Sequence, residues 1–229
     1  MNDLTLIIPA KNESGPLPQV INSLKNLNCK ILVSLQPDDS DTINAIKSLN
    51  VKVLKQSGNG YGNSLIEGIW ACDTKFFCIF NADGSFEKLD LKKMYELVNQ
   101  NDFIFASRYE QNAGSEDDTI ITLIGNKIFT FMGKLLFSLK ISDILFTYIM
   151  GNTNSFKKLN IKSSDFRFCV ELPIKMHNAK MKYETLPSYE KKRLSGEKKV
   201  NAFKDGFLIL IEILRLFVQI KIFRNHKIS

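Results

Sequence analysis

The sequence predicts an α/β fold in which a mainly parallel sheet is flanked by helices. In the first half of the chain, short apolar or β-branched runs alternate with longer segments whose apolar residues recur at helical spacing. Such alternation is typical of a parallel sheet with helical crossovers. The length of 229 residues, with 44% hydrophobic and 24% charged residues, matches an ordinary globular domain. Disordered and fibrous classes are therefore excluded.

The individual elements follow from these patterns. Strands are predicted at 4–8, 30–34, 51–54, 76–80 and 103–106. The intervening helices are predicted at 15–27, 41–49, 61–71 and 89–99. The second half predicts an irregular stretch over 140–158, a strand at 182–186, and helices at 119–139, 168–178 and 201–223. We expect residues 1–199 to form the main domain and residues 200–229 a C-terminal amphipathic helix and tail.

The net charge indicates which classes of partner the protein binds, and the cysteine content indicates its cellular compartment. The 31 basic and 24 acidic residues give a net charge of +7, which favours anionic partners such as nucleotides, phosphates or lipid headgroups. No zinc spacing or helix-turn-helix signal predicts nucleic-acid binding. The four cysteines lack metal spacing, so we expect reduced thiols in a cytoplasmic protein. No secretory signal is expected, and no segment reaches about 18 uninterrupted apolar residues, the length of a membrane span.

Polar segments follow every predicted strand. In a parallel sheet, ligands bind beyond the carboxyl ends of the strands, so these segments are the candidate site. Asp83 stands in the sequence Asn81-Ala82-Asp83-Gly84 after the fourth strand. A carboxylate there can bind a divalent cation that bridges two phosphates. The same residues also fit a turn closed by the aspartate side chain, and the sequence leaves both interpretations open.

Four motifs occur in a fixed order along the chain. They are LIIPAKNE at 6–13, PDDSDT at 37–42, NAD at 81–83 and ASRY at 106–109. In this order the chain resembles the family 2 glycosyltransferases with the GT-A fold, particularly the polyprenyl-phosphate branch typified by dolichyl-phosphate mannose synthase. The resemblance extends from Leu4 to about Val200. It implies a GT-A fold and the transfer of a sugar from a nucleotide diphosphosugar.

The resemblance also implies a donor site. In the family, the first loop lines the nucleoside pocket, the second contacts the base or ribose, and a glycine-rich turn lies beside the donor. The corresponding residues are Pro9, Ala10, Lys11, Glu13, Asp38, Asp39 and Gly60. The metal-binding D-x-D motif corresponds to Asn81, Ala82 and Asp83, which makes Asp83 the expected ligand of Mg²⁺ or Mn²⁺ and Asn81 a neutral contact. Gly60 has the alternative of a turn that requires a positive φ.

Acceptor residues are implied in the same way. Arg108 matches an arginine expected near the acceptor, and Asp143 and Glu171 match family acids. With Asp83, the resemblance makes Arg108 and Asp143 the expected catalytic residues. The loop at 191–199, KKRLSGEKK, resembles the family segment R-x-x-G-x-S-K, which implies phosphate contacts from Arg193 and Lys199.

Structural roles stay open for these residues. Arg108 has the alternative of a structural arginine, Glu171 that of a buried, paired carboxylate, and the basic loop that of a solvated surface. A hydroxyl acceptor needs a general base, for which Asp143, Asp165 or Glu171 would serve. A phosphate acceptor is largely ionised already and needs none.

The sequence therefore predicts a metal-dependent, inverting glycosyltransferase. Its acceptor is a polyprenyl phosphate at the cytoplasmic face of the membrane or a cell-surface glycan. The alternative is a catalytically degenerate domain that binds a nucleotide or a partner, because Asn81 replaces an acid. The helical patterns at 119–139 and 201–223 fit packing on the domain, on a partner such as a second copy, or on a membrane surface.

Overall fold

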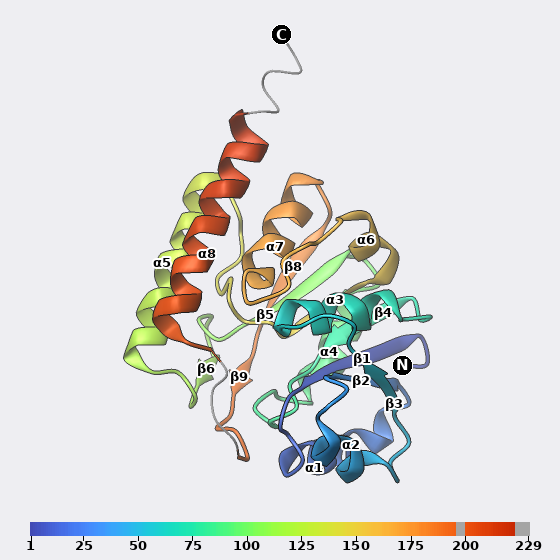
Figure 1. The fold of residues 1–229 in the computed structure, drawn as a ribbon. Helices are drawn as coiled ribbons and strands as arrows, with labels where there is room; N and C mark the ends of the chain where they lie inside the picture. The colour runs from blue at the N-terminus through green and yellow to red at the C-terminus, as the bar shows by residue number, and fades with distance from the viewer. Residues whose placement is uncertain (196–199, 223–229) are drawn as a thin grey trace.

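A computed structural model of the protein describes residues 1–195 and 200–222. A seven-stranded sheet with the order β3-β2-β1-β4-β7-β5-β8 forms its centre (Figure 1). The strands are β1 (Leu4–Ala10), β2 (Lys30–Leu35), β3 (Lys52–Lys55), β4 (Phe76–Ile79), β5 (Phe103–Ser107), β7 (Ile149–Asn152) and β8 (Tyr183–Pro187). Only β7 runs antiparallel, between β4 and β5. The mainly parallel sheet and its predicted strands are confirmed.

Helices cover both faces of the sheet. They are α1 (Pro16–Leu24), α2 (Ser40–Ile46), α3 (Tyr61–Trp70), α4 (Asp90–Leu97), α5 (Ile120–Phe137), α6 (Thr153–Lys158), α7 (Phe168–Asn178) and α8 (Ala202–Phe217). A 3₁₀ turn (Lys25–Leu27) follows α1, and a π-helical segment (Val218–Ile222) follows α8. Each helix that the sequence predicted is present, and α7 has the predicted bounds.

Two hydrophobic cores lie on the two faces of the sheet. Along β1, Leu4, Leu6 and Ile8 face the core that α1, α2 and α4 complete, whereas Ile7 faces the core of α3, α6 and α7. Side chains alternate between the faces of a strand, so a strand buried on both faces is a continuous apolar run. Each fully buried aliphatic side chain stabilises the fold by roughly 1.5–3 kcal/mol.

The region from 140 to 158, predicted to be irregular, instead forms β7 and α6. Asn152 ends β7 and caps α6, because its side-chain oxygen accepts hydrogen bonds from the N–H groups of Asn154 and Ser155. A Cβ on Gly151 would lie 2.6 Å from the ring of Phe103, so only glycine fits between the neighbouring aromatic side chains. The four-residue strand depends on partners on both sides, which a local sequence pattern does not reveal.

A third core joins α5, α7 and α8 at one side of the molecule. In Figure 1, α5 and α8 lie side by side. Phe129 lies next to Gly206, and Phe137 lies next to Phe217 further along both helices, which shows that the two helices run parallel. Among the described helices, α5 alone has the length and mean hydropathy of a membrane-crossing helix, although only 22% of it is buried. The sequence analysis looked for an uninterrupted apolar run, and Lys127 and Lys134 interrupt this one. The mean hydropathy of α5 nevertheless stays high enough for a membrane-crossing helix.

Candidate active site

The carboxyl ends of the six parallel strands lie at one edge of the sheet, because β7 alone is reversed. The segments that follow β1, β2, β3, β4 and β5 contain the predicted site residues from Lys11 to Arg108. Pro9 and Ala10 are the last residues of β1 and pair with Ser34 and Leu35 of β2. The topology therefore brings the first three motif loops and the Ser107-Arg108 segment to the same edge.

The first two loops are tied together by hydrogen bonds. The N–H of Asn12 donates to Asp39 Oδ2 at 2.7 Å, and the N–H of Glu13 donates to Thr42 Oγ1 at 3.0 Å. Asp39 also caps α2, because its Oδ1 accepts from the N–H of Thr42. Asp39 thus holds the two loops in place, while Lys11 and Asp38 are exposed beside it.

Asp83 lies just beyond the end of β4, with a side chain that is 12% exposed. Its Oδ1 accepts the N–H of Ser85 at 3.0 Å, which is the side-chain-closed turn that the sequence left open. Its Oδ2 faces Arg193 Nη1 at 3.8 Å, longer than a hydrogen bond. Asn81 donates weakly to Ser85 Oγ at 3.4 Å. One oxygen of Asp83 therefore closes the turn, while the other faces the Arg193 guanidinium.

The glycine-rich turn packs against another loop. Gly60 has φ +106°, and a Cβ there would lie 2.3 Å from the carbonyl oxygen of Ser164. A Cβ on Gly62 would lie 2.2 Å from the carbonyl oxygen of Ser163. Close backbone packing thus requires both glycines, and the positive φ of Gly60 is that of the turn that the sequence allowed as an alternative.

Tyr61, between these glycines, is a residue that the sequence analysis missed. Its hydroxyl lies 2.7 Å from Thr147 Oγ1, and its ring stacks on Phe166 at 4.9 Å. Burial raises the pKa of Tyr61, with further contributions from Cys169 and Asp83, so the phenol stays protonated. An aromatic residue between two glycines at a helix start was the available signal.

Arg108 and Asp143 meet in the interior of the protein. Arg108 donates to Asp143 from Nε at 2.7 Å and from Nη2 at 3.0 Å, and from Nη1 to Glu190 at 2.9 Å. Asp143 is fully buried and also accepts from Asn126 of α5. Burial favours a lower pKa for Arg108, but Asp143 and its other carboxylate partners outweigh it and raise that pKa. These two expected catalytic residues bind each other rather than face an open site.

Glu171 lies elsewhere, buried at the first turn of α7. It accepts hydrogen bonds from the N–H groups of Lys162 and Ser163 and pairs with Lys175 at 2.6 Å. Burial favours a higher pKa for Glu171, but these donors outweigh it and lower that pKa. Its position is that of a paired, buried carboxylate that fixes the segment packed against Gly62.

The described part of the basic loop, residues 191–195, lies against the turn that carries Asp83. The short strand β9 (Tyr189–Glu190) pairs with β6 (Gly114–Ser115) and leads into this loop. The N–H of Lys191 donates to the carbonyl oxygen of Ser85, and the N–H of Leu194 donates to that of Asp83. The loop is therefore attached to the turn that carries Asp83. Lys199 lies outside the described residues.

Arg193 links this loop to an acidic segment that the sequence analysis missed. Its Nη2 donates to Asp117 at 2.8 Å, and this bond raises the pKa of Arg193. The neighbouring Asp118 lies 3.4 Å from Arg108 Nη1. The run Glu116-Asp117-Asp118 was the signal in the sequence, but nothing local showed that it would meet the basic loop.

Carboxylates outnumber the guanidinium groups that they contact. Arg108 and Arg193 share five carboxylates, which are Asp83, Asp117, Asp118, Asp143 and Glu190. Within the described chain, no three His, Cys, Asp or Glu side chains gather to enclose a metal. Mg²⁺ is commonly held by one or two carboxylates together with substrate phosphates. Asp83 fits that arrangement as the protein ligand of a cation that arrives with a diphosphate.

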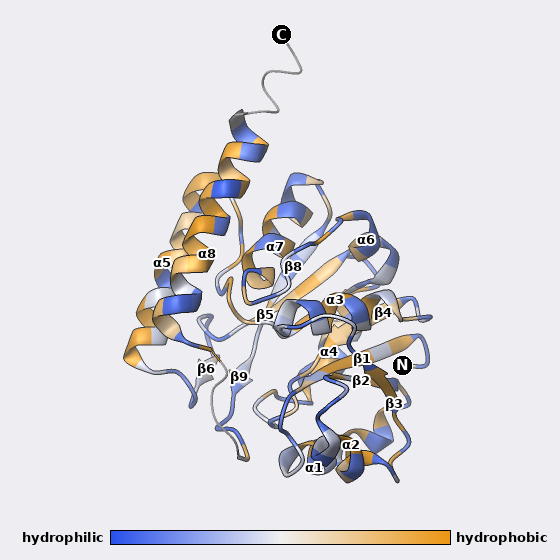
Figure 2. Ribbon diagram, in the orientation of Figure 1, coloured by the Kyte–Doolittle hydropathy of each residue, from blue (hydrophilic) through white to orange (hydrophobic). Residues whose placement is uncertain are grey.

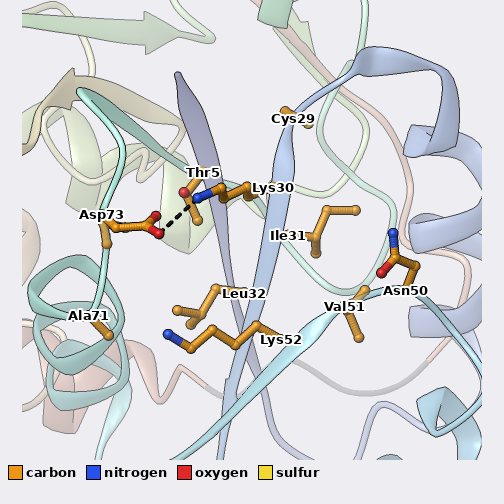
Figure 3. Close-up of a pocket in the computed structure, with 11 residues that line it drawn as sticks. Thr5, Cys29, Lys30, Ile31, Leu32, Asn50, Val51, Lys52, Ala71 and Asp73 are labelled. Carbon is orange, nitrogen blue, oxygen red and sulfur yellow. Dashed lines mark hydrogen bonds and ion pairs between the residues drawn. The ribbon is translucent and has the colours of Figure 1, made fainter. Parts of the chain in front are cut away.

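A separate cavity of about 320 Å³ lies at the opposite edge of the sheet (Figure 3). It is lined by the amino ends of β1, β2 and β3, and Lys30 pairs there with Asp73 at 2.8 Å. Burial raises the pKa of the adjoining Cys72 to about 12, so the thiol stays protonated. Because it lies at the amino ends of the strands, this cavity is not part of the candidate site.

The fold and its loops define a GT-A-like α/β protein. A model of the family Glycosyl transferase family 2 matches residues 5–159, and the chain belongs to that family. Curated relatives include proteins named as uncharacterized glycosyltransferases, Rv0539 of Mycobacterium tuberculosis and Mb0553 of Mycobacterium bovis. Each is 25% identical over 111 residues, which is 48% of this chain and 50% of the relative. The chain thus matches about half the length of these relatives.

Solved structures share the fold across most of the chain. Glucosyl-3-phosphoglycerate synthase from Mycobacterium tuberculosis, in complex with Mn²⁺, UDP and glucosyl-3-phosphoglycerate, superposes with a TM-score of 0.74 at 11% identity, covering 93% of this chain and 79% of that one. Mannosyl-3-phosphoglycerate synthase from Rubrobacter xylanophilus gives a TM-score of 0.70 at 11% identity, covering 94% and 74%. At such low identity these likenesses show the fold alone, and the expected GT-A-like fold is confirmed.

Proposed function

We propose that this chain transfers a sugar from a nucleotide diphosphosugar to a polyprenyl phosphate at the cytoplasmic face of a membrane, with inversion at the anomeric carbon. The observation that carries the proposal is the position of Asp83, beyond the carboxyl end of β4, which pairs with β1, the strand that leads into the tied donor loops. A dianionic diphosphate would enter such a site together with a divalent cation. The manganese and UDP bound by the phosphoglycerate synthase support this donor chemistry.

The donor loops divide into positioning and contacting groups. The two carboxylate oxygens of Asp39 accept hydrogen bonds from the N–H groups of Asn12 and Thr42, so Asp39 positions the first loop. Lys11 and Asp38 are exposed next to it and are the side chains proposed to contact the nucleoside. Asp83 and the donor diphosphate would hold Mg²⁺ or Mn²⁺, which supplies positive charge against the leaving diphosphate.

A phosphate acceptor suits this chain better than a hydroxyl acceptor, because a hydroxyl needs a general base and the candidate bases are paired. The three acids offered as general bases all have partners, since Asp143 binds Arg108, Glu171 binds Lys175, and Asp165 binds Arg167 at 2.8 Å. A phosphate monoester is largely ionised at neutral pH, so its oxygen attacks without losing a proton to the protein. That oxygen forms the new bond to the anomeric carbon, and the nucleoside diphosphate leaves with the electrons of the broken bond.

Arg108 and Asp143 are proposed as positioning residues. Their buried pair joins the end of β5 to α5 through Asn126 and, through Glu190, to β9, which leads into the basic loop. Arg193, held by Asp117 beside Asp83, is the cation proposed to meet phosphate when the donor or acceptor binds. Its long contact with Asp83 leaves room for that exchange of partners.

The test is turnover of sugar nucleotides by the purified protein with Mn²⁺. Short-chain polyprenyl phosphate, 3-phosphoglycerate and a glycan are offered as separate acceptors, with product release measured for each. We expect transfer to the polyprenyl phosphate, and Asp83→Ala should lower kcat/KM at least a hundredfold. Transfer only to 3-phosphoglycerate or to the glycan would overturn the acceptor. Nucleotide binding without any turnover would favour the degenerate domain that Asn81 suggests.

A further inference from the structure

We propose that the exposed face of α5 and α8 is a docking surface for membranes that contain anionic lipid. This surface is defined by two apolar stripes and the basic residues that border them. The docking itself is independent of the transfer reaction, whereas its link to a lipid-borne acceptor rests on the proposed function. Figure 2 shows hydrophobic residues along both helices, at the outer side of the molecule.

The stripe on α5 lies opposite its buried face. Its exposed members are Ile120, Ile121, Ile124, Ile128, Phe131 and Leu135, which recur every three or four residues from Ile121 onward. The buried side of the same helix holds Asn126, Thr130, Gly133 and Phe137. Large apolar side chains exposed in such a contiguous row are unusual on a protein that meets only water.

The stripe on α8 has the same form. Its exposed members are Phe203, Phe207, Ile211 and Leu214, and Val218 at the start of the π-helical segment continues the row. The buried side of α8 holds Ile209, Ile213 and Leu216, which pack in the core shared with α5 and α7. Because the two helices run parallel and in contact, their stripes form one apolar face.

The basic residues around this face favour an anionic membrane as its partner. α5 contains no acidic residue, and its exposed Lys127 and Lys134 lie along one border of the stripe. On α8, Lys204 and Arg215 border the stripe. Of its two acids, Glu212 is buried and paired with Arg215, and Asp205 accepts the N–H of Asn201 at the start of the helix. An apolar face bordered by lysine and arginine is the pattern of helices that lie in the interface of an anionic membrane.

Hydrogen bonds that attach α5 to the site indicate that this helix lies on the membrane surface and does not cross the membrane. Asn126 binds Asp143, and Thr130 Oγ1 accepts the N–H of Ile144, so insertion of α5 as a span would break buried hydrogen bonds. α5 begins two residues after Asp118, which pairs with Arg108. A membrane docked on this face would therefore lie close to the catalytic edge, where a lipid-borne phosphate could enter.

The test is flotation of the purified protein with vesicles in the absence of substrates. Vesicles of phosphatidylcholine alone are compared with vesicles containing an equal part of phosphatidylglycerol, at low and at high salt. We expect binding to the anionic vesicles at low salt and weaker binding at high salt. The double variant Ile124→Gln, Phe207→Gln should lower the partition coefficient at least tenfold, since these side chains are 53% and 64% exposed.

Two matched controls separate docking from general surface effects. Trp70→Gln removes an apolar side chain that is 54% exposed at the end of α3, and it should leave flotation unchanged. The triple variant Lys127→Gln, Lys134→Gln, Lys204→Gln should lose anionic preference, whereas Lys25→Gln, Lys47→Gln, Lys92→Gln, with equal loss of charge, should retain most of it. Thermal melting of each variant confirms that it folds.

Three results would overturn the proposal. The first is no flotation by the wild type, and the second is equal flotation by the Ile124, Phe207 variant. The third is a stable dimer in solution that the same double variant dissociates, which would assign the face to a second copy. Transfer to a short-chain, water-soluble acceptor should persist in the double variant, so failure of docking and failure of the proposed reaction are distinguishable.

Discussion

Asp143 and Arg108 were expected to act directly on substrate, yet the structure pairs them inside the protein. Arg108 is 9% exposed and Asp143 is fully buried, so each charge depends on the other for stabilisation. The sequence placed Arg108 at the carboxyl end of its strand, whereas Asp143 was matched only by its resemblance to a family acid. The sequence could not show that the segment between them, 109–142, folds back to bury the pair, because that requires the tertiary position of α5.

Removing one member of this pair should destabilise the fold. Asp143→Ala leaves the Arg108 guanidinium buried with weaker compensation, and we expect the free energy of unfolding to fall by about 3 kcal/mol. Urea denaturation monitored by circular dichroism measures the change. Asp73→Ala, which breaks the exposed pair with Lys30, is the control and should have little effect. An equally small effect at Asp143 would contradict the assigned role.

At the scale of elements, the sequence predicted those with local signatures and missed those defined by partners. The five runs that became β1 to β5 are apolar and bounded by polar turns, so periodicity was sufficient. β7 and the β6–β9 pair are four and two residues long, and their hydrogen bonds run to distant segments. The glycine-rich turn was recognised, but its contact with the 163–165 segment was not.

The space around each glycine predicts opposite effects for alanine substitutions at Gly62 and Gly125. Gly62→Ala forces a Cβ to within 2.2 Å of the Ser163 carbonyl oxygen, so we expect a loss of about 1–3 kcal/mol as the loop shifts. Gly125→Ala, in α5, meets no atom within 4 Å and should be neutral or stabilise by up to about 1 kcal/mol. Thermal melting of both variants measures the difference. A Gly62 variant as stable as the Gly125 variant would mean that the two segments do not pack closely.

At the scale of the whole molecule, one edge of the sheet gathers the motif loops, and one side of the molecule exposes an apolar face. The family and the GT-A-like fold followed from the ordered motifs, and both are confirmed. The roles of individual residues stay predictions, because likeness of fold does not transfer a site. The acidic segment at 116–118 shows the limit most clearly, since its partners Arg108 and Arg193 lie about 10 and 76 residues away.

The central claim is that Asp83 and a nucleoside diphosphate together bind a divalent cation. Titration of Mn²⁺ by electron paramagnetic resonance, with UDP and GDP present in turn, tests it without requiring turnover. We expect the wild type to bind Mn²⁺ with at least one of these nucleotides, and Asp83→Ala to weaken that binding at least tenfold while melting normally. Equal Mn²⁺ binding by the wild type and the variant, or no nucleotide-dependent binding by either, would contradict the claim.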